Sequence, residues 1–536
     1  MKLPNKSGLL IWGAFLFSTG TVIVCLSYAV GEANLAPATP VEIAALAWTG
    51  LSFLLLLWWG IHHLCFQTAS VFMDSGAESL PVLRHPKRFV ILCMVCDDFD
   101  PASVLSCLSQ TDLGKGHRLI ICDDSESEEE KSRVDSFCKE HPTVELIRRG
   151  DRAGYKAGNI NHALGVIEPA SDDWIVIVDA DELLDPAHLW SLGCFIHDLP
   201  ESVGIVQGLS DRRLPAQTRL QECLSLEIPL CFRTVLPSRG RFGFVPYLGH
   251  AGAFRAGAWK AAGGFPAVVS EDYAFAIRLR SLGFQGVVWQ GSTVRESYPN
   301  SFKALFRRLS KFSSGTGELF RYLKKEATFS RSGVITASEK FDALMQLGIY
   351  VINPIALLNV FVFGWLSGRS EWMNPILVPP LLPYLFLTLT LWAVSFLPTG
   401  SPRFGEIFRY WSTASTVYLS LSPAVAFAFV RGLIKGARFD PTHGRTSNAA
   451  SLPAREFRLA MIFTPILGIG ALLLGSTCDS PFRWVIAGHG ISYLLFPIGP
   501  LFNREDFLGS ICRGLFVIPT VCFILALVAL YSQTWY

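Results

Sequence analysis

Long runs without a charged residue occupy both ends of this 536-residue chain and restrict its fold more than any other feature. Two runs, Gly8–Gly31 and Ala44–Ile61, precede the middle of the chain. Six more follow it: Ala343–Ser367, Met373–Pro402, Trp411–Val430, Leu459–Cys478, Val485–Phe502 and Leu515–Tyr536. At about 1.5 Å per helical residue, such runs match a hydrocarbon core about 30 Å thick. A cleaved signal peptide is the alternative for the first run, but its length and the second run favour a membrane helix.

The composition agrees with a membrane protein. Only 17% of the residues are charged, whereas soluble domains have about 25%. The formal net charge of +2 offers no basic surface of the kind that nucleic acid binds, so no nucleic-acid partner is expected. We therefore expect a multi-pass integral membrane protein, in contact with membrane lipids, that carries a water-soluble insert between its apolar ends.

Lysine and arginine positions predict the orientation, because short loops rich in these residues stay in the cytoplasm. Lys2 and Lys6 place the N-terminus inside. Two spans then return the chain, so the insert, from about Gln67 to Phe341, is expected in the cytoplasm, at the inner or plasma membrane. Basic residues flank Trp411–Val430 on both sides, which favours an interfacial or re-entrant segment, with a span as the alternative. About seven spans result, two before the insert and five after it.

Short apolar runs alternate with helical patterns in the insert. The candidate strands are Phe89–Cys96, Leu119–Cys122, Val144–Ile147, Trp174–Val178 and Val203–Gln207. Segments between them, such as Asp124–Glu140 and Tyr155–Gly165, suit helices. Near-continuous apolar strands are covered on both faces, so this pattern predicts an α/β domain with a mostly parallel sheet. Ligands of such folds bind at the carboxyl ends of the strands.

Acidic residues follow three of these strands, namely Asp97–Asp98, Asp123–Asp124 and the pair Asp179 and Asp181. Carboxylates that converge on one sheet edge repel unless a cation or hydrogen-bond donors neutralise them, which favours a functional site over turns and caps. The D-x-D spacing puts Asp179 and Asp181 on one face of an extended chain. Both could then reach one Mg²⁺ or Mn²⁺ ion, which prefers oxygen ligands and shares them with phosphates.

A further acidic pair precedes a short helical pattern. Ser270, Glu271 and Asp272 come directly before Tyr273–Leu282, which matches a helix ended by Gly283. Either Ser270 or Glu271 could cap this helix. The functional alternative is that Asp272 is a general base that takes a proton from an attacking hydroxyl.

Four motifs occur in a fixed order: Ile121–Ser125 with its two aspartates, Lys156–Asn161, Asp179–Asp181 and Ser270–Asp272. Together they resemble the family 2 inverting glycosyltransferases with a GT-A fold, and the membrane-flanked layout is similar to the cellulose synthase-like processive polysaccharide synthases. The resemblance implies a GT-A-type, mostly parallel α/β domain inserted between transmembrane α-helices. The expected division is two N-terminal membrane helices in 1–66, the GT-A domain in 67–299, interfacial helices in 300–341, membrane helices in 342–402, an interfacial segment with a gating-like loop in 403–457, and membrane helices in 458–536.

The resemblance also implies roles for single residues. Asp272 would be the catalytic base, and Asp181 would bind the metal, Mg²⁺ or Mn²⁺. The nucleotide sugar would contact Asp97, Asp123, Lys156 and Asp179. At Asp97 the chain departs from the family, which has a Pro-Thr-Tyr-Asn-like turn where this chain has Cys96-Asp97-Asp98-Phe99, so the choice between the two acids stays open. A solvated lysine is the alternative for Lys156.

The acceptor site would include His250 and Glu271, with a core histidine as the alternative for His250. The largest departure concerns the Q-x-x-R-W motif of processive synthases, where this chain has Arg308-Leu309-Ser310-Lys311-Phe312. Lys311 keeps a positive charge but not the bidentate fork of arginine, and Phe312 keeps a flat face for a sugar. An amphipathic interfacial helix, Phe302–Leu323, is compatible with both roles.

Phe439 and Thr442, in Phe439-Asp440-Pro441-Thr442, resemble the start of the gating loop of such synthases. The resemblance implies transfer of a sugar from a nucleoside diphosphate sugar, by family expectation a UDP-sugar, to a growing β-linked polysaccharide, with coupled export. The alternative is transfer of a single sugar to a lipid or another membrane acceptor. A transporter or receptor that only binds a nucleotide is disfavoured by the ordered acids. The sugar, the linkage and any accessory subunit are left open.

Overall fold

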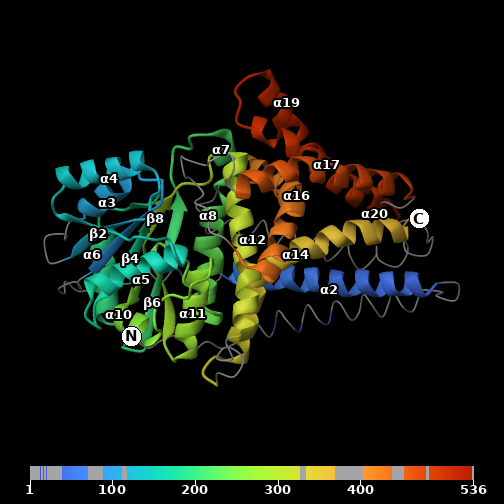
Figure 1. Cartoon of the computed structure of the whole chain (residues 1–536). Coiled ribbons are helices and arrows are strands. Elements are labelled where there is room, and N and C mark those ends of the chain that lie inside the picture. The colour runs from blue at the N-terminus through green and yellow to red at the C-terminus, as the bar shows by residue number, and fades with distance from the viewer. Residues whose placement is uncertain are drawn as a thin grey trace.

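A computed structural model of the chain describes residues 39–69, 89–110, 117–325, 333–367, 403–437, 452–478 and 482–533, with 13, 16 and 20 as isolated residues. It has two parts, an α/β domain built around one sheet and a group of long helices beside it (Figure 1). The predicted gating residues Phe439 and Thr442 lie outside the described residues, as does the run Met373–Pro402 and most of Gly8–Gly31.

The four strands predicted first from the sequence form one half of the sheet. They are β1 (Phe89–Val95), β2 (Arg118–Asp123), β3 (Val144–Arg148) and β4 (Trp174–Asp179). They lie in the order β3-β2-β1-β4, and all three pairings are parallel. Every residue of β1 is buried, which is why its sequence is a continuous apolar run.

The other half of the sheet is more irregular. It consists of β5 (Leu183–Leu184), β6 (Val203–Arg212), β7 (Gly252–Arg255) and β8 (Gln285–Glu296). The described sheet continues β4-β7-β6-β8-β5, and only the β6–β8 pairing in this half is parallel. The predicted α/β class is therefore confirmed, with a mixed sheet in which a parallel half carries the acidic strand ends.

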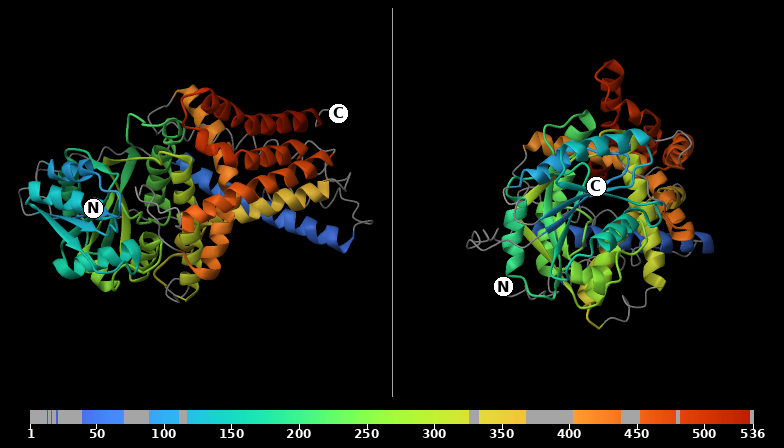
Figure 2. Two further views of the ribbon diagram at one scale, coloured as in Figure 1. Left: turned by 45° about the horizontal axis from the view of Figure 1, so that its top comes forward. Right: turned by 60° about the vertical axis from the view of Figure 1, so that its left-hand side comes forward.

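Helices cover both faces of the sheet (Figures 1 and 2). One core packs the sheet against α5 (Tyr155–Ile167) and α11 (Glu271–Ser281), and the other packs it against α3 (Pro101–Leu108), α4 (Glu128–Glu140) and α6 (His188–His197). The short α10 (Ala256–Ala261) joins the first of these faces. Strand ends and helix starts thus meet at one edge, where ligands of α/β domains bind.

A third core joins the domain to the long helices. The domain contributes α7 (Arg219–Leu224), α8 (Glu227–Leu230), a π-helix (Cys231–Val235), α9 (Leu236–Phe242) and the predicted amphipathic α12 (Phe302–Lys325). Leu224, Phe306 and Leu421 are buried together in this core. The α/β domain therefore packs against helices from the C-terminal part of the chain.

The remaining helices match most of the uncharged runs. They are α2 (Pro40–Ala69), α14 (Ala337–Ser367), α16 (Phe404–Lys435), α17 (Leu452–Ser476), α18 (Phe482–Leu494) with a 3₁₀ turn (Phe496–Leu501), α19 (Phe507–Leu515) and α20 (Ile518–Gln533). Among the described residues, five helical stretches, each beginning at or after Ala337, are long and apolar enough to cross a membrane, and one of them is Phe404–Lys435. The chain is thus consistent with a multi-pass membrane protein.

The helix α16 contains the run Trp411–Val430, whose membrane placement the sequence left between interface and span. It lies alongside α12 and runs across the direction of α2 and α14 in Figure 1 and in the left view of Figure 2. Its contact with α12 is a close backbone approach, because a Cβ at Gly432 would lie 2.0 Å from the Ser314 carbonyl oxygen. An interfacial position for α16 stays a prediction that this arrangement favours.

Candidate active site

The D-x-D turn begins where β4 ends. The Asp179 amide donates a 2.9 Å hydrogen bond to Glu182 Oε2, and Asp181 lies in the turn between them. The Glu182 side chain is almost fully buried. Its second oxygen, Oε1, lies 2.9 Å from His250 Nδ1. The Glu182 carboxylate therefore fixes the turn. Glu182 was not predicted from the sequence, although it lies one residue beyond the D-x-D motif.

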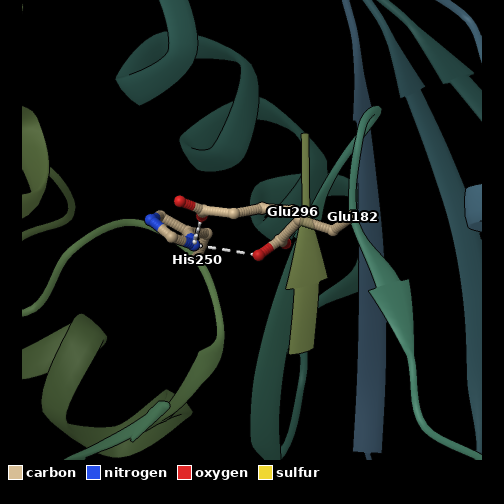
Figure 3. Close-up of side chains that lie close together, drawn as sticks. All are labelled: Glu182, His250 and Glu296. Carbon is tan, nitrogen blue, oxygen red and sulfur yellow. Dashed lines mark hydrogen bonds and ion pairs between the residues drawn. The ribbon is translucent and has the colours of Figure 1, made fainter. Parts of the chain in front are cut away.

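His250 stands between two carboxylates, one from the turn after β4 and one from the end of β8 (Figure 3). Its Nδ1 is 2.9 Å from Glu182 and 3.4 Å from Glu296 Oε2, at the end of β8. Burial by itself lowers the pKa of His250, but the charges of Glu182 and Glu296 outweigh it and raise the pKa to about 10. Burial raises the pKa of Glu296 to about 7. His250 is therefore an ion-paired residue beside the D-x-D turn, and its predicted acceptor contact stays a prediction.

Lys156, on α5, bridges the D-x-D motif and the loop that carries His250. Its Nζ lies 2.7 Å from Asp179 Oδ1 and 3.0 Å from the Gly249 carbonyl oxygen. Burial acts to lower the pKa of Lys156, but Asp179 and Glu271 outweigh it and raise it above its ordinary value. Burial likewise acts to raise the pKa of Asp179, and Lys156 holds it low instead. The alternative of a solvated lysine is thus wrong.

Asp272 lies in the first turn of α11, on the other side of the same loop. A Cβ at Gly249, whose φ is +76°, would lie 3.1 Å from Asp272 Oδ2, so only glycine lets the loop pass this close. Ser270 occupies the N-cap position of α11, one of the two predicted for it and Glu271, but its side chain makes no capping hydrogen bond there. Burial raises the pKa of Asp272 above its ordinary range. Burial and then Asp272 raise the pKa of Glu271 to about 8.

The helix α12 brings Lys311 near this group, with Phe312 beside it; the interfacial position of α12 stays a prediction. Burial and the charge of Lys156 lower the pKa of Lys311, while Asp179 and Glu271 act in the opposite direction. The Lys311 ammonium is therefore close enough to interact electrostatically with these three residues. The Lys311 Nζ is 5.3 Å from the centre of the Phe312 ring, and the ring keeps 36% of its surface exposed. An exposed aromatic face beside buried charges can stack on a sugar.

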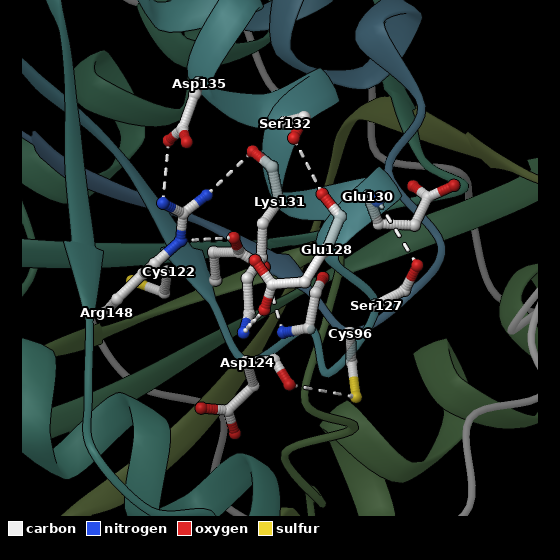
Figure 4. Close-up of polar contacts among 12 residues, drawn as sticks. Cys96, Cys122, Asp124, Ser127, Glu128, Glu130, Lys131, Ser132, Asp135 and Arg148 are labelled. Carbon is white, nitrogen blue, oxygen red and sulfur yellow. Dashed lines mark hydrogen bonds and ion pairs between the residues drawn. The ribbon is translucent and has the colours of Figure 1, made fainter.

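Asp97 and Asp123 make contacts within the protein. Asp97 Oδ1 accepts hydrogen bonds of 2.9 Å from the amides of Glu126 and Ser127. Asp123 Oδ2 lies 2.7 Å from Arg148 Nε, and its side chain is fully buried. Arg148 also binds Asp135 and the Lys131 carbonyl (Figure 4). These bonds shape the loops after β1 and β2, and the predicted contacts of both acids with the nucleoside stay predictions.

Asp98 is electrostatically joined to the D-x-D motif. Burial raises its pKa to about 7, and the charges of Asp181 and Asp179 add to this effect. The Cys96 amide donates a 2.7 Å hydrogen bond to Asp98 Oδ1. The negative charges of Asp181 and Asp179 thus act on Asp98, and a divalent cation would relieve this repulsion. The residues present therefore fit an oxygen-ligated cation.

A second donor set borders the first. Glu182, His250 and Glu296 offer one nitrogen and two carboxylate oxygens, all within 4.8 Å of one another. Manganese accepts imidazole and carboxylate ligands, whereas magnesium prefers oxygen. The site therefore has an acidic and histidine arrangement that could hold a metal, next to the carboxylates that the D-x-D pattern predicted.

Two family models match overlapping parts of the chain. The model of glycosyl transferase family group 2 matches residues 174–430, and that of glycosyl transferase family 2 matches residues 98–238. A solved structure, mannosyltransferase PcManGT from Pyrobaculum calidifontis in complex with GDP-Man and Mn²⁺, is 17% identical, with a TM-score of 0.47 over 73% of this chain and 99% of that chain.

Two curated relatives from Arabidopsis thaliana are also named as mannosyltransferases. Glucomannan 4-beta-mannosyltransferase 9 is 24% identical over 68% of this chain and 70% of its own length. Probable glucomannan 4-beta-mannosyltransferase 1 is 27% identical over 44% of this chain, and the match spans only 42% of that relative. The two overlapping family matches together span residues 98–430, and over this range the chain is similar to the glycosyltransferases of family 2.

Proposed function

We propose that this chain is an inverting glycosyltransferase that moves a sugar from a nucleoside diphosphate sugar to a growing β-linked polysaccharide. One observation carries the proposal: Lys156 joins Asp179 to the Gly249 carbonyl, and Gly249 in turn abuts Asp272. The donor-binding motif and the candidate base are thus on opposite sides of one short loop. A single displacement needs its leaving group and its base in this relation.

In the proposed reaction, Asp272 accepts the proton of the acceptor hydroxyl as that oxygen attacks the anomeric carbon. The raised pKa of Asp272 suits a base, because a buried carboxylate with few partners holds a proton more strongly. Attack from the face opposite the diphosphate inverts the configuration, so an α-linked donor gives a β-linked product. Lys156 and Lys311 balance the negative charge of the diphosphate.

A divalent cation bound by Asp181, with Asp98 or Asp179 nearby, would neutralise the diphosphate as a Lewis acid. The protein's own part is to hold these oxygens in place. Glu182 does this by accepting the Asp179 amide hydrogen bond. The donor set supports Mg²⁺ or Mn²⁺ and does not discriminate between them.

Mannose is the first sugar to test. The relatives named above are glucomannan 4-beta-mannosyltransferases, which supports a mannosyl donor and a β-linked glycan acceptor. The resemblance to cellulose synthase-like enzymes favours UDP-sugars, so both nucleotides belong in the comparison. The apolar helices beside the α/β domain support a membrane position. Lys2 and Lys6 favour an active site in the cytoplasm, and export of the glycan through the helices is part of the proposal.

Transfer of a single sugar is the second candidate. It is favoured by Arg308-Leu309-Ser310-Lys311-Phe312, which lacks the glutamine, arginine and tryptophan of the processive motif. Lys311 cannot hold an oxyanion with a bidentate fork. An enzyme of this kind would use the same base and donor site but would release its product after one transfer.

Membranes that contain the protein test both candidates. They are incubated with GDP-mannose, GDP-glucose, UDP-glucose and UDP-N-acetylglucosamine, with Mg²⁺ or Mn²⁺, and released nucleoside diphosphate and product length are measured. We expect turnover of a GDP-sugar into a β-linked glycan. A product extended by one residue would support single transfer, and absence of turnover with every donor would contradict both candidates.

A further inference from the structure

The helix that carries the candidate base is attached at its start to a membrane helix. The Tyr273 hydroxyl donates a 3.0 Å hydrogen bond to the Ala343 carbonyl of α14. The Tyr273 ring is buried and packs 5.6 Å from the Phe244 ring, measured between centres. Asp272 Oδ1 accepts a 2.7 Å bond from the Tyr273 amide. The orientation of the Asp272 carboxylate is therefore set by the same residue that contacts α14.

The far end of α11 is attached to the same membrane helix. Arg280 forms a two-pronged pair with Glu339, with distances of 2.9 Å from Nε to Oε1 and 3.0 Å from Nη2 to Oε2. The Glu339 side chain is 2% exposed. Its Oε2 also accepts hydrogen bonds from the amide and hydroxyl of Thr336, each of 3.0 Å. A buried bidentate pair whose acceptor is fixed by other bonds defines direction as well as distance.

The first turns of α14 are themselves fixed to the α/β domain. Asp342 Oδ2 accepts a 2.8 Å bond from the Phe244 amide, and Gln346 Nε2 donates a 3.2 Å bond to the Phe244 carbonyl. Arg239 and His62 lie 3.4 Å and 3.5 Å from Asp342 Oδ1. Yet Ala337–Leu366 is also long and apolar enough to cross a membrane. The helix α14 thus contacts the α/β domain at its start and also belongs to the group of long apolar helices.

We propose that the first turns of α14 position the catalytic base, with Tyr273 and Arg280 as the positioning residues on α11. The inference rests on the proposed role of Asp272. Because α11 is held at both ends, a shift of α14 moves Asp272 relative to the acceptor, while the donor contacts on β4 and α5 stay in place. Misplacement of a reacting group by about 1 Å can cost up to about 100-fold in rate.

Tyr273→Phe and Arg280→Lys test the inference, because each removes one attachment and keeps the packing or the charge. In each purified variant, turnover is divided by the number of donor-binding sites, measured with labelled nucleotide sugar. We expect kcat per binding site to fall about three- to tenfold in each single variant and further in the double variant. The donor KM should stay within about twofold of the wild type. Tyr493→Phe, which alters another buried tyrosine on α18, should leave both values unchanged.

Two results would overturn the inference. One is a kcat per site within twofold of the wild type in the double variant. The other is a parallel loss of donor sites and turnover, which would indicate a purely structural role. Asp272→Asn is measured beside them: an active Asp272→Asn variant contradicts the proposed function itself, whereas an inactive one with unaffected α11 variants contradicts only the positioning role of α14.

Discussion

At the scale of single residues, Lys156 holds one positive charge between Asp179 and the acids of α11. Its charge lowers the pKa of Asp272, which burial raises. Lys156→Met should therefore raise that pKa further and leave less of the base ionised at a given pH. We expect the acid limb of the kcat–pH profile to move to higher pH, with the largest loss of rate at low pH.

The profile is compared with that of Lys139→Met, which removes an exposed charge on α4. The Lys139 variant should reproduce the wild-type limb. A limb that stays in place, or moves to lower pH, in Lys156→Met would show that Lys156 does not act on the base.

The raised pKa of His250 leads to a prediction of how the stability of the folded protein depends on pH. Its pKa in the folded protein is about 10, against an ordinary value of 6.5. Its charging therefore stabilises the fold fully below pH 6.5, and this contribution is lost as the pH rises through 10. The difference in Tm between wild type and His250→Gln should shrink between pH 7 and 10.

The measurement is thermal unfolding in detergent with a chelator present, so that no metal occupies the Glu182–His250–Glu296 set. A Tm difference that stays constant across this range would mean that His250 is neutral at pH 7. The ion-paired description of the triad would then be wrong.

At the scale of elements, α12 and α16 meet through glycines. A Cβ at Gly432 would lie 2.0 Å from the Ser314 carbonyl oxygen, and one at Gly317 would lie 2.4 Å from the Phe429 carbonyl oxygen. Gly432→Ala should destabilise the protein by about 1–3 kcal/mol, because backbone must move. Activity should fall as well, since α12 carries Lys311.

Gly405→Ala is the matched control on the same helix, because a Cβ there meets nothing within 4 Å. Unfolding midpoints and turnover of the two variants are compared. Equal effects at the two positions would contradict the close approach of α12 and α16.

Strands buried on both faces were predictable from the sequence, and short or half-exposed strands were not. β1 to β4 match their apolar runs within two residues. β5 has only two residues, and β8 mixes buried with exposed positions over its length. Local patterns carry no signal for such strands, because their pairing is decided by distant partners.

Residues of the candidate site were likewise predictable where they belong to a local motif, and not where only the fold brings them together. Asp179, Asp181 and Asp272 belong to sequence motifs, and the structure gathers the charges of all three around Lys156 and Asp98. Glu296 was not predictable, because it lies at the end of a strand that the sequence did not indicate. The roles of Asp97 and Asp123 in holding loops depend on amides and an arginine that only the fold brings near.

At the scale of the whole molecule, the direction of α16 predicts its topology. It lies along α12 and across α2 and α14 (Figure 1). Both of its ends should therefore be on the side of the α/β domain. A membrane-impermeant maleimide should label Arg403→Cys and Lys435→Cys in inside-out vesicles.

Thr39→Cys, at the end of α2 away from the α/β domain, should be labelled only from the opposite side. The wild-type chain serves as the background for its own cysteines. Labelling of Arg403→Cys and Lys435→Cys from opposite sides would show that α16 spans the membrane.

The most direct measurement compares sugar transfer with donor binding in Asp272→Asn. The account predicts that this variant binds the nucleotide sugar with wild-type affinity and loses about 100-fold or more of its transfer rate. Asp172→Asn, an exposed change just before β4, should keep both. Transfer by Asp272→Asn at a rate near that of the wild type would contradict the assignment of Asp272 as the base and, with it, the mechanism built on it.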